Sequence, residues 1–438
     1  MTGSLALAGI ALRSVLQHRR RNAILVLALA VVTALLVLLN GVACGIDESM
    51  TRTATTLNTG QLNVAGFFKV SPSQFSPVVT NYPDVERVIR TATPELRSMA
   101  RRGRGWAKVI SQTRAMQTGI TGVDVTSEPE FQRVVQVRAG SLIALAEPNT
   151  IVIFEGQARK LELKVGDAVT LFAQTTRGVA NTLDCRVVAI AKDVGLLGKY
   201  NMFISNPTLR ALYELGPETV GALQLTFDGL RPAELTPIAA RLRKALVAAG
   251  YQLMVEDNRP FWMKFESVSH QDWTGQRLDV SSWQDELSFI TWTIDLFHGL
   301  AFTLVLVLVL VVVMGILNTM WIAIRERTRE IGTLRAIGMQ RREVLLLFLL
   351  ESALLGLTAT ALGGGLGVLA AAALNQLSIP VPPAVQLFLM SEHLHIAIRA
   401  PDVLTAVLVL TSVTCFAALY PCIRAARLRP IEAISHLG

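Results

Sequence analysis

The charged residues with the most informative spacing lie between Arg325 and Glu343, where the chain reads RERTREIGTLRAIGMQRRE. This loop carries six arginines and three glutamates and lies between two long apolar stretches. Arginine is concentrated in the cytoplasmic loops of membrane proteins, so we expect the loop to face the cytosol. Its apolar residues Ile331, Leu334 and Ile337 recur every third position, so a short helix would carry an apolar stripe beside its charges.

Two explanations compete for this loop. A solvated, arginine-rich anchor for lipid headgroups would account for the charge alone. It would not account for the interleaved glutamates, the two glycines or the apolar stripe, which favour docking into a groove of a cytosolic protein. In such a groove the stripe would fill the cleft while Arg329, Glu330 and Arg335 pair along its rim. We call the following residues the docking segment: Arg325, Glu326, Arg327, Arg329, Glu330, Ile331, Gly332, Leu334, Arg335, Ile337 and Gly338.

Four further candidates lie inside the apolar stretches. Glu351 stands about two turns into one of them, where a carboxylate is costly and is by default a functional candidate. We favour a contact with the arginines of the loop or with a neighbouring helix over a proton relay. Gly363 and Gly367 form a GxxxG pattern, which lets a second helix approach closely, either within the chain or between subunits. We interpret Asn318 as a residue that forms a hydrogen bond between helices rather than as one that binds a substrate.

The sequence offers no catalytic apparatus. A phosphate-binding loop requires the pattern GxxxxGK[ST], and the Gly198-Lys199 pair is followed by Tyr200 and lacks the first glycine. Neither GxSxG nor HExxH occurs. His393 and His395 would form at most a weak metal pair, and a surface loop is the simpler interpretation. We therefore expect no catalytic residue, no metal and no cofactor held by this chain.

Composition indicates which elements position these residues. The chain has 438 residues, of which 51% are hydrophobic, and a mean hydropathy of +0.45. A helix needs about 20 residues to cross hydrocarbon. Four stretches that each contain at most one charged residue are long enough: 22–46, 296–324, 344–374 and 401–423. We therefore predict an integral membrane protein with four transmembrane helices, the first of which is too long for a cleaved signal peptide.

The basic charge is confined to segments next to these helices. Residues 1–23, 325–343 and 424–438 together hold thirteen arginines and four acidic residues, whereas the net charge of the whole chain is +8. The remainder is therefore close to neutral, and binding to nucleic acid is excluded as an explanation of the basic pI. The positive-inside rule predicts that 1–21, 325–343 and 424–438 are cytoplasmic. It places 47–290 and 375–400 on the outer side of the membrane.

The outer segment 47–290 is long enough for a core of its own and reads as α+β. Each of its ends shows a strand, a helix and further strands, and a mostly β insert lies between them. The expected elements at the ends are strands at Leu57–Gly66, Trp106–Asp124, Gly221–Asp228 and Tyr251–Glu256 and helices at Tyr82–Thr91 and Glu234–Ala249. Helical spacing over Asp272–Asp295 predicts a stalk that extends the second span outward. Trp283 and Trp292 on that stalk fit an interfacial aromatic belt.

Several stretches resemble one family. ERTREIGTLRAIGMQRREVLLLFLLESALLGL (Glu326–Leu357) and YPCIRAARLRPIEAI (Tyr420–Ile434) are similar to the FtsX-like permease domain of type VII ABC transporters. That superfamily includes macrolide-exporter, lipoprotein-releasing and cell-division permeases. HRRRNAILVLALAVVTALLVL resembles its first span, and VIFEGQARKLELKVGDAVTLF (Val152–Phe172) resembles the periplasmic core domain of the macrolide-exporter type.

This resemblance implies a mechanism. Such permeases form homodimers or heterodimers in the bacterial inner membrane, and their cytoplasmic loop binds an ATP-binding subunit. ATP-driven motion reaches the periplasmic domain without substrate passing between the helices. By matching positions, Arg325–Gly338 would couple to the ATPase, 50–134 and 216–285 would form a porter-like lobe, and 135–215 an inserted lobe. Since these residues contain no phosphate-binding loop, we expect ATP to be bound by a separate ATPase subunit.

The resemblance leaves the cargo open. One expectation is the movement of lipoproteins or lipids taken from the outer leaflet. Another is the expulsion of amphiphilic molecules from the periplasm with the help of an adaptor or carrier protein. An alternative from a different class is a non-transporting regulator of a periplasmic cell-wall enzyme. Membrane lipid is an expected contact in every case.

Overall fold

The structure is a computed structural model that describes residues 13, 19–71, 74–229, 232–382, 385–386 and 389–427. Most of the expected cytoplasmic N-terminus and the tail beyond 427 lie outside these residues. The chain divides into two compact units. The helical unit comprises the described parts of Met1–Glu48, Ile294–Pro380 and His393–Gly438, and the β-rich unit comprises those of Ser49–Thr293 and Val381–Glu392.

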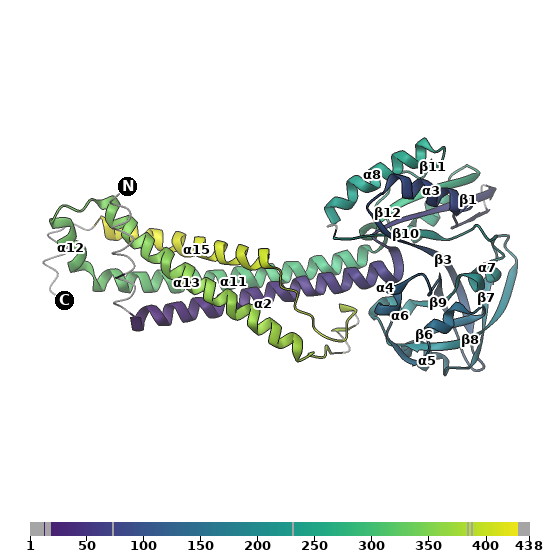
Figure 1. Ribbon diagram of the computed structural model, residues 1–438, viewed down its shortest axis with the longest axis horizontal. Helices are drawn as coiled ribbons and strands as arrows, with labels where there is room; N and C mark the ends of the chain where they lie inside the picture. Colours follow the sequence, from purple (N-terminus) through teal and green to yellow (C-terminus); the bar gives the residue numbers. More distant parts are fainter. Residues whose placement is uncertain are drawn as a thin grey trace. The chain divides into compact units, whose positions relative to one another are not determined.

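Within the described residues, four helices are long and apolar enough to cross a membrane, at Asn22–Thr59, Ser288–Glu326, Arg341–Gln376 and Ala400–Ala426 (Figure 1). The first consists of α2 (Arg19–Ala54) and the short π-helix η1 (Thr55–Thr59), and the others are α11, α13 and α15. Helices suit hydrocarbon because every backbone hydrogen bond is made inside the segment. A short helix, α12 (Thr328–Ala336), lies between α11 and α13 in the sequence.

Glycines of α13 set its packing within the helical unit. A Cβ atom added at Gly363 would lie 2.6 Å from Thr33 Cβ on α2, and one at Gly367 would lie 2.9 Å from Val37 Cβ. One at Gly356 would lie 3.1 Å from a methyl group of Thr414 on α15. The GxxxG pattern therefore serves a contact within one chain, which decides between the two alternatives that the sequence left open.

The first sheet of the β-rich unit has the order β11-β12-β1-β10-β3, with β2 paired to β1. Helices α3 and α8 cover it and bury Val85, Ile89, Leu242 and Leu246 (Figure 1). The bounds are β1 (Leu62–Ser71), β2 (Gln74–Ser76), α3 (Tyr82–Ala92), β3 (Leu96–Ile110), β10 (Ala222–Phe227), α8 (Pro232–Ala248), β11 (Gln252–Leu253) and β12 (Gly275–Ser282).

Strand β3 continues into a second sheet that closes on itself. The hydrogen-bonded neighbours run β3-β4-β9-β6-β8-β7 and return to β3, so six strands form a barrel. Apolar side chains such as Val109, Ile151, Leu171, Val187 and Ile204 fill its interior. The bounds are β4 (Ala115–Val123), β6 (Thr150–Phe154), β7 (Ala168–Gln174), β8 (Ala180–Ala191) and β9 (Asn201–Ser205).

Shorter elements complete the β-rich unit. They are α4 (Pro129–Val134), β5 (Val137–Gly140), which pairs with β8, η2 (Ile143–Ala146), α5 (Glu155–Leu161), α6 (Gly195–Tyr200), α7 (Asn206–Tyr213), η3 (Phe261–Met263), α9 (Lys264–Ser269) and α10 (Trp283–Glu286).

The structure differs from the sequence-based expectations in three places. The barrel takes β3 and β4 from 50–134, which was assigned to the porter-like lobe, because closure of the ring requires them. The strand expected from Leu57 begins at Leu62, since the preceding helix continues to Thr59. The stalk expected over Asp272–Asp295 is wrong in its first half, where Gly275–Ser282 pairs with β1 as strand β12. Trp283, expected in an interfacial belt, is buried.

The glycine contact gives a prediction with a matched control. Gly363→Ala should weaken the packing of α13 on α2 by about 1–3 kcal/mol, because overpacking forces the backbones apart. Gly365→Ala should be tolerated, since no atom lies within 4 Å of its added Cβ. Thermal denaturation of the two purified variants would measure the difference. Equal loss of stability in both variants would contradict the assignment.

Candidate functional site

The docking segment folds as a helix followed by a turn. Helix α11 ends at Glu326, α12 spans Thr328–Ala336, and α13 begins at Arg341. Gly338 has a φ of +111°, a left-handed conformation that glycine adopts without strain. Glu343 then accepts a hydrogen bond from the Gln340 backbone N–H at 2.8 Å, which caps the first turn of α13.

The apolar stripe of the docking segment is divided. Ile331 is 2% exposed and belongs to one cluster of buried apolar side chains with Val344 and Phe348 of α13 and Ala425 of α15. The expectation that Ile331 fills a partner's cleft is therefore wrong, because α12 needs this side chain to pack on its own chain. Ile337, in contrast, is 80% exposed. The side chain of Leu334 lies outside the described residues, and Gly332 is buried.

The Arg327 side chain ties the start of α12 to Glu351. Its Nη1 lies 3.3 and 3.1 Å from the two carboxylate oxygens of Glu351. The Arg327 and Glu351 side chains are only 12% and 7% exposed, so the ion pair is largely removed from solvent. Arg327 Nε also bonds Glu330 at 3.0 Å. Glu351 thus meets an arginine of the loop, as one of the sequence-based alternatives proposed.

The remaining charges of the docking segment divide by exposure. Arg335 donates to the Ala426 carbonyl at 3.4 Å, at the end of α15, where a cation is favourable. The side chains of Arg325, Glu326, Arg329 and Glu330 are exposed. Among the described side chains of the docking segment, the exposed ones are therefore these charged groups together with Ile337.

Asn318 makes no hydrogen bond to another helix among the described residues. It lies on an exposed face of α11 within the apolar stretch, so the expected hydrogen bond between helices stays a prediction. Gly363, Gly367 and Glu351, in contrast, all contact other helices of the same unit.

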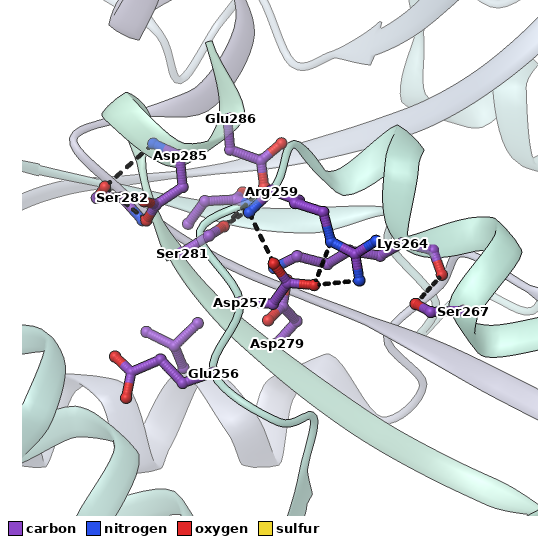
Figure 2. Close-up of polar contacts among 12 residues, drawn as sticks. Glu256, Asp257, Arg259, Lys264, Ser267, Asp279, Ser281, Ser282, Asp285 and Glu286 are labelled. Atoms are coloured by element: carbon purple, nitrogen blue, oxygen red, sulfur yellow. Dashed lines mark hydrogen bonds and ion pairs between the residues drawn. The ribbon is translucent and has the colours of Figure 1, made fainter. Parts of the chain in front are cut away.

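A second group of polar residues, which the sequence did not reveal, lies on strands β1 and β12 of the first sheet and on helices α9 and α10 (Figure 2). Lys264 Nζ donates to Asp279 Oδ2 at 2.7 Å, and both side chains are at most 2% exposed. Burial raises the pKa of Asp279, and the ammonium group of Lys264 opposes that rise. Ser281 Oγ donates to Glu286 Oε1 at 2.7 Å, and Asn63 Nδ2 lies 3.3 Å from the same atom.

Side chains of the same sheet also bond the backbone of η1, which continues the first long helix. Arg102 is 1% exposed, donates to the Thr56 carbonyl at 2.9 Å, and pairs with Glu128 at 2.5 Å. Gln224 accepts from Arg102 Nε at 3.2 Å and donates to the Asn58 carbonyl. Burial raises the pKa of Glu128, and the Arg102 guanidinium opposes that rise.

We call five of these residues the anchor network: Asn63, Arg102, Gln224, Ser281 and Glu286. Through Arg102 and Gln224 it holds the residues that end the first long helix, and through Glu286 it holds α10, directly before α11. Asn63 and Gln224 alternate with apolar residues on their strands, which in sequence is typical of a solvent-facing side. Its one hydroxyl group, that of Ser281, is buried and donates to the Glu286 carboxylate, and the network suits mechanical attachment.

Two family models match the chain. The model of the MacB-like periplasmic core domain matches residues 23–245, about half of the 438 residues, and that of the FtsX-like permease C-terminal matches residues 302–430. With four apolar helices and a large β-rich unit, the chain is a membrane protein of the permease class. It belongs to the MacB-like family of ABC transporter permeases with an FtsX-like C-terminal region.

Individual relatives match over shorter stretches. The uncharacterized ABC transporter permease YvrN of Bacillus subtilis (strain 168) is 33% identical over 122 residues, 28% of this chain and 26% of that protein. The macrolide export ATP-binding/permease protein MacB of Chlorobium luteolum is 36% identical over 123 residues, 28% of this chain and 16% of that protein. The chain thus spans about a quarter or less of these relatives.

Among solved structures, the periplasmic region of MacB from Actinobacillus actinomycetemcomitans aligns with 54% of this chain and 94% of that chain. The sequence identity is 10% and the TM-score is 0.30, which is too low to carry an argument.

The buried ion pair gives a second prediction. Glu351→Ala should destabilise the helical unit by about 3–5 kcal/mol, because it removes the buried carboxylate of Arg327 and leaves the guanidinium only the exposed Glu330 as an acidic partner. The double variant Arg327→Met, Glu351→Met should recover most of this loss. Thermal denaturation followed by size-exclusion chromatography would measure both. A double variant that is no better than Glu351→Ala would show that the pair is not what holds α12 to α13.

Proposed function

We propose that this protein is the permease subunit of an ABC transporter that couples ATP hydrolysis by a separate ATPase subunit to motion of the β-rich unit. One observation carries the proposal. A single helix, α11, starts directly after the anchor network and ends at the docking segment. Its 39 residues correspond to about 58 Å at 1.5 Å per residue. A continuous helix can transmit displacement between its two ends.

The orientation of the protein is part of the proposal. The excess of arginine in the docking segment favours its placement in the cytosol, where an ATPase is available. The β-rich unit would then lie in the periplasm and the helices in the inner membrane, with both termini cytoplasmic. In the docking segment, Arg325, Glu326, Arg329, Glu330 and Ile337 are exposed and would meet the ATPase.

A second copy of the chain, or a related permease, would complete the complex. Asn318 supports this because a polar side chain exposed on an apolar helix is costly in lipid unless a partner helix receives it. We propose that Asn318 lies at such an interface.

The cargo follows from the placement of the β-rich unit. The proposed substrates are lipoproteins, lipids or other amphiphiles reached from the periplasmic side, with an adaptor or carrier protein receiving them. Macrolide export is named for relatives that match a third of this chain or less, so it is not carried over.

Binding to the ATPase can be tested with variants that leave the fold intact. Glu330→Lys and Ile337→Asp should each abolish co-purification with the ATPase subunit, because both side chains are exposed. Glu330→Lys also breaks the ion pair with Arg327, and the control at Glu147 breaks a comparable pair with Arg186. Glu147→Lys and Val247→Asp, at exposed positions of the β-rich unit, are the matched controls. Full binding and ATPase stimulation by both docking variants would refute the assignment.

The proposed orientation has its own test. In a variant whose four cysteines are replaced by alanine, Lys199→Cys should react with an impermeant maleimide on intact cells. Thr333→Cys should react only after lysis, and both positions are exposed. The native Cys185 thiol is itself unreactive toward maleimide, because burial raises its pKa to about 12. The reverse labelling pattern would overturn the orientation.

A further inference from the structure

Strand β3 presents a stripe of basic and aromatic side chains. Ala107 and Val109 belong to the barrel core, so the alternate residues Arg104, Trp106 and Lys108 lie on the outside of the barrel. Lys108 pairs across the strands with Phe172 of β7, which is also on the outer side and 38% exposed. The stripe therefore combines two cations with two exposed rings.

Two hollows meet along this stripe. One has a volume of about 520 Å³ and reaches Tyr200, Trp262 and Phe289, and the other has about 650 Å³ and reaches Lys108 and Phe172. Both are of a size that holds a small molecule. They share Arg104, Gly105, Trp106 and Phe261 as lining residues. We call the two hollows together the β3 cleft.

The charge of the β3 cleft is positive. Arg104 donates to Asn63 Oδ1 at 3.1 Å and stacks on the Phe261 ring at 5.1 Å, and its side chain remains 18% exposed. Glu286 lies 3.9 Å from it but is only 7% exposed and is bonded by Ser281. Arg102 also lines the cleft, is 1% exposed, and has an Nη1 atom without a hydrogen-bond partner among the described residues.

The walls of the cleft are aromatic and open. Trp106 is 54% exposed, and Trp262, Tyr200 and Phe289 are 66%, 55% and 47% exposed. Large rings gathered at one hollow indicate a binding surface, since scattered exposure would not place them together.

We propose that the β3 cleft binds an acidic amphiphile, a molecule whose carboxylate or phosphate group is joined to an apolar body. Arg104 and Lys108 would hold the acidic group through charge-assisted hydrogen bonds. Trp106, Phe172 and Phe261 would cover the apolar body. The inference rests on the proposed transport of amphiphiles and specifies their class. A cationic amphiphile is disfavoured because Glu286 is buried and already bonded.

The test uses the full-length chain alone, in nanodiscs of zwitterionic lipid. A fatty acid that carries an alkyl diazirine is photo-crosslinked to the protein, and the labelled peptides are identified by mass spectrometry. Octyl phosphate, octyltrimethylammonium and inorganic phosphate then compete separately. We expect labelling in β3 or β7 and displacement by octyl phosphate at concentrations at least tenfold lower than by the other two. Equal competition by octyltrimethylammonium would refute the requirement for an acid, and competition by inorganic phosphate at the same concentration would refute the amphiphile.

Variants locate the site. Arg104→Gln and Lys108→Gln should each weaken octyl phosphate at least fivefold, and Trp106→Ala should reduce labelling by a similar factor. Lys108 and Trp106 are exposed, so their variants keep the test valid if Arg104→Gln fails to fold. Arg159→Gln and Lys160→Gln, on the exposed side of α5, are the controls. Unchanged binding in Lys108→Gln and Trp106→Ala, or labelling confined to the long helices, would overturn the proposal.

No ATPase is present in this experiment. Loss of amphiphile binding would therefore leave the docking result standing, and loss of ATPase binding would leave the amphiphile result standing.

Discussion

The β-rich unit depends on a single constraint, namely that strand β3 belongs to two sheets. Its first half pairs with β10 and its second half with β4 and β7. Gly103 and Gly105 stand at the change of partner because α7 packs there. A Cβ at Gly103 would lie 2.9 Å from Leu209, and one at Gly105 would lie 2.5 Å from the Tyr213 ring. The residues on the inner side of β3 must be small so that α7 can approach. The long basic side chains of this part of the strand therefore lie on its outer side.

The helical unit has a constraint of its own, which is the free-energy cost of removing a charged group from water. A guanidinium next to a membrane span is tolerated when a carboxylate and good geometry offset its desolvation. Arg327 meets this condition through Glu351, which fixes where α12 begins. Ile331 then turns inward and Ile337 remains outside. This ion pair therefore accompanies the division of the docking segment into a buried and an exposed part.

Elements defined by local pattern could be predicted from the sequence, and elements defined by distant partners could not. Helix α3 was expected at Tyr82–Thr91 and spans Tyr82–Ala92, because its apolar spacing and initial proline are local signals. Strand β12 was missed because GQRLDVSS is a strand only beside β1, and the closure of β7 on β3 leaves no periodic signal. Arg327 and Glu351 are 24 residues apart, and their pairing follows from the fold of α12 onto α13.

The anchor network and the β3 cleft share a hydrogen-bonded path. Arg104 in the cleft donates to Asn63, and Asn63 lies 3.3 Å from the Glu286 carboxylate in α10, directly before α11. An acidic group bound by Arg104 would compete with Asn63 and Glu286 for its N–H groups. Conversely, displacement of the start of α11 would move Glu286 and change what Arg104 can donate. Under the proposed function, the occupancy of the cleft and the position of the helix that ends at the docking segment are therefore coupled through two hydrogen bonds, and that coupling must act equally in both directions.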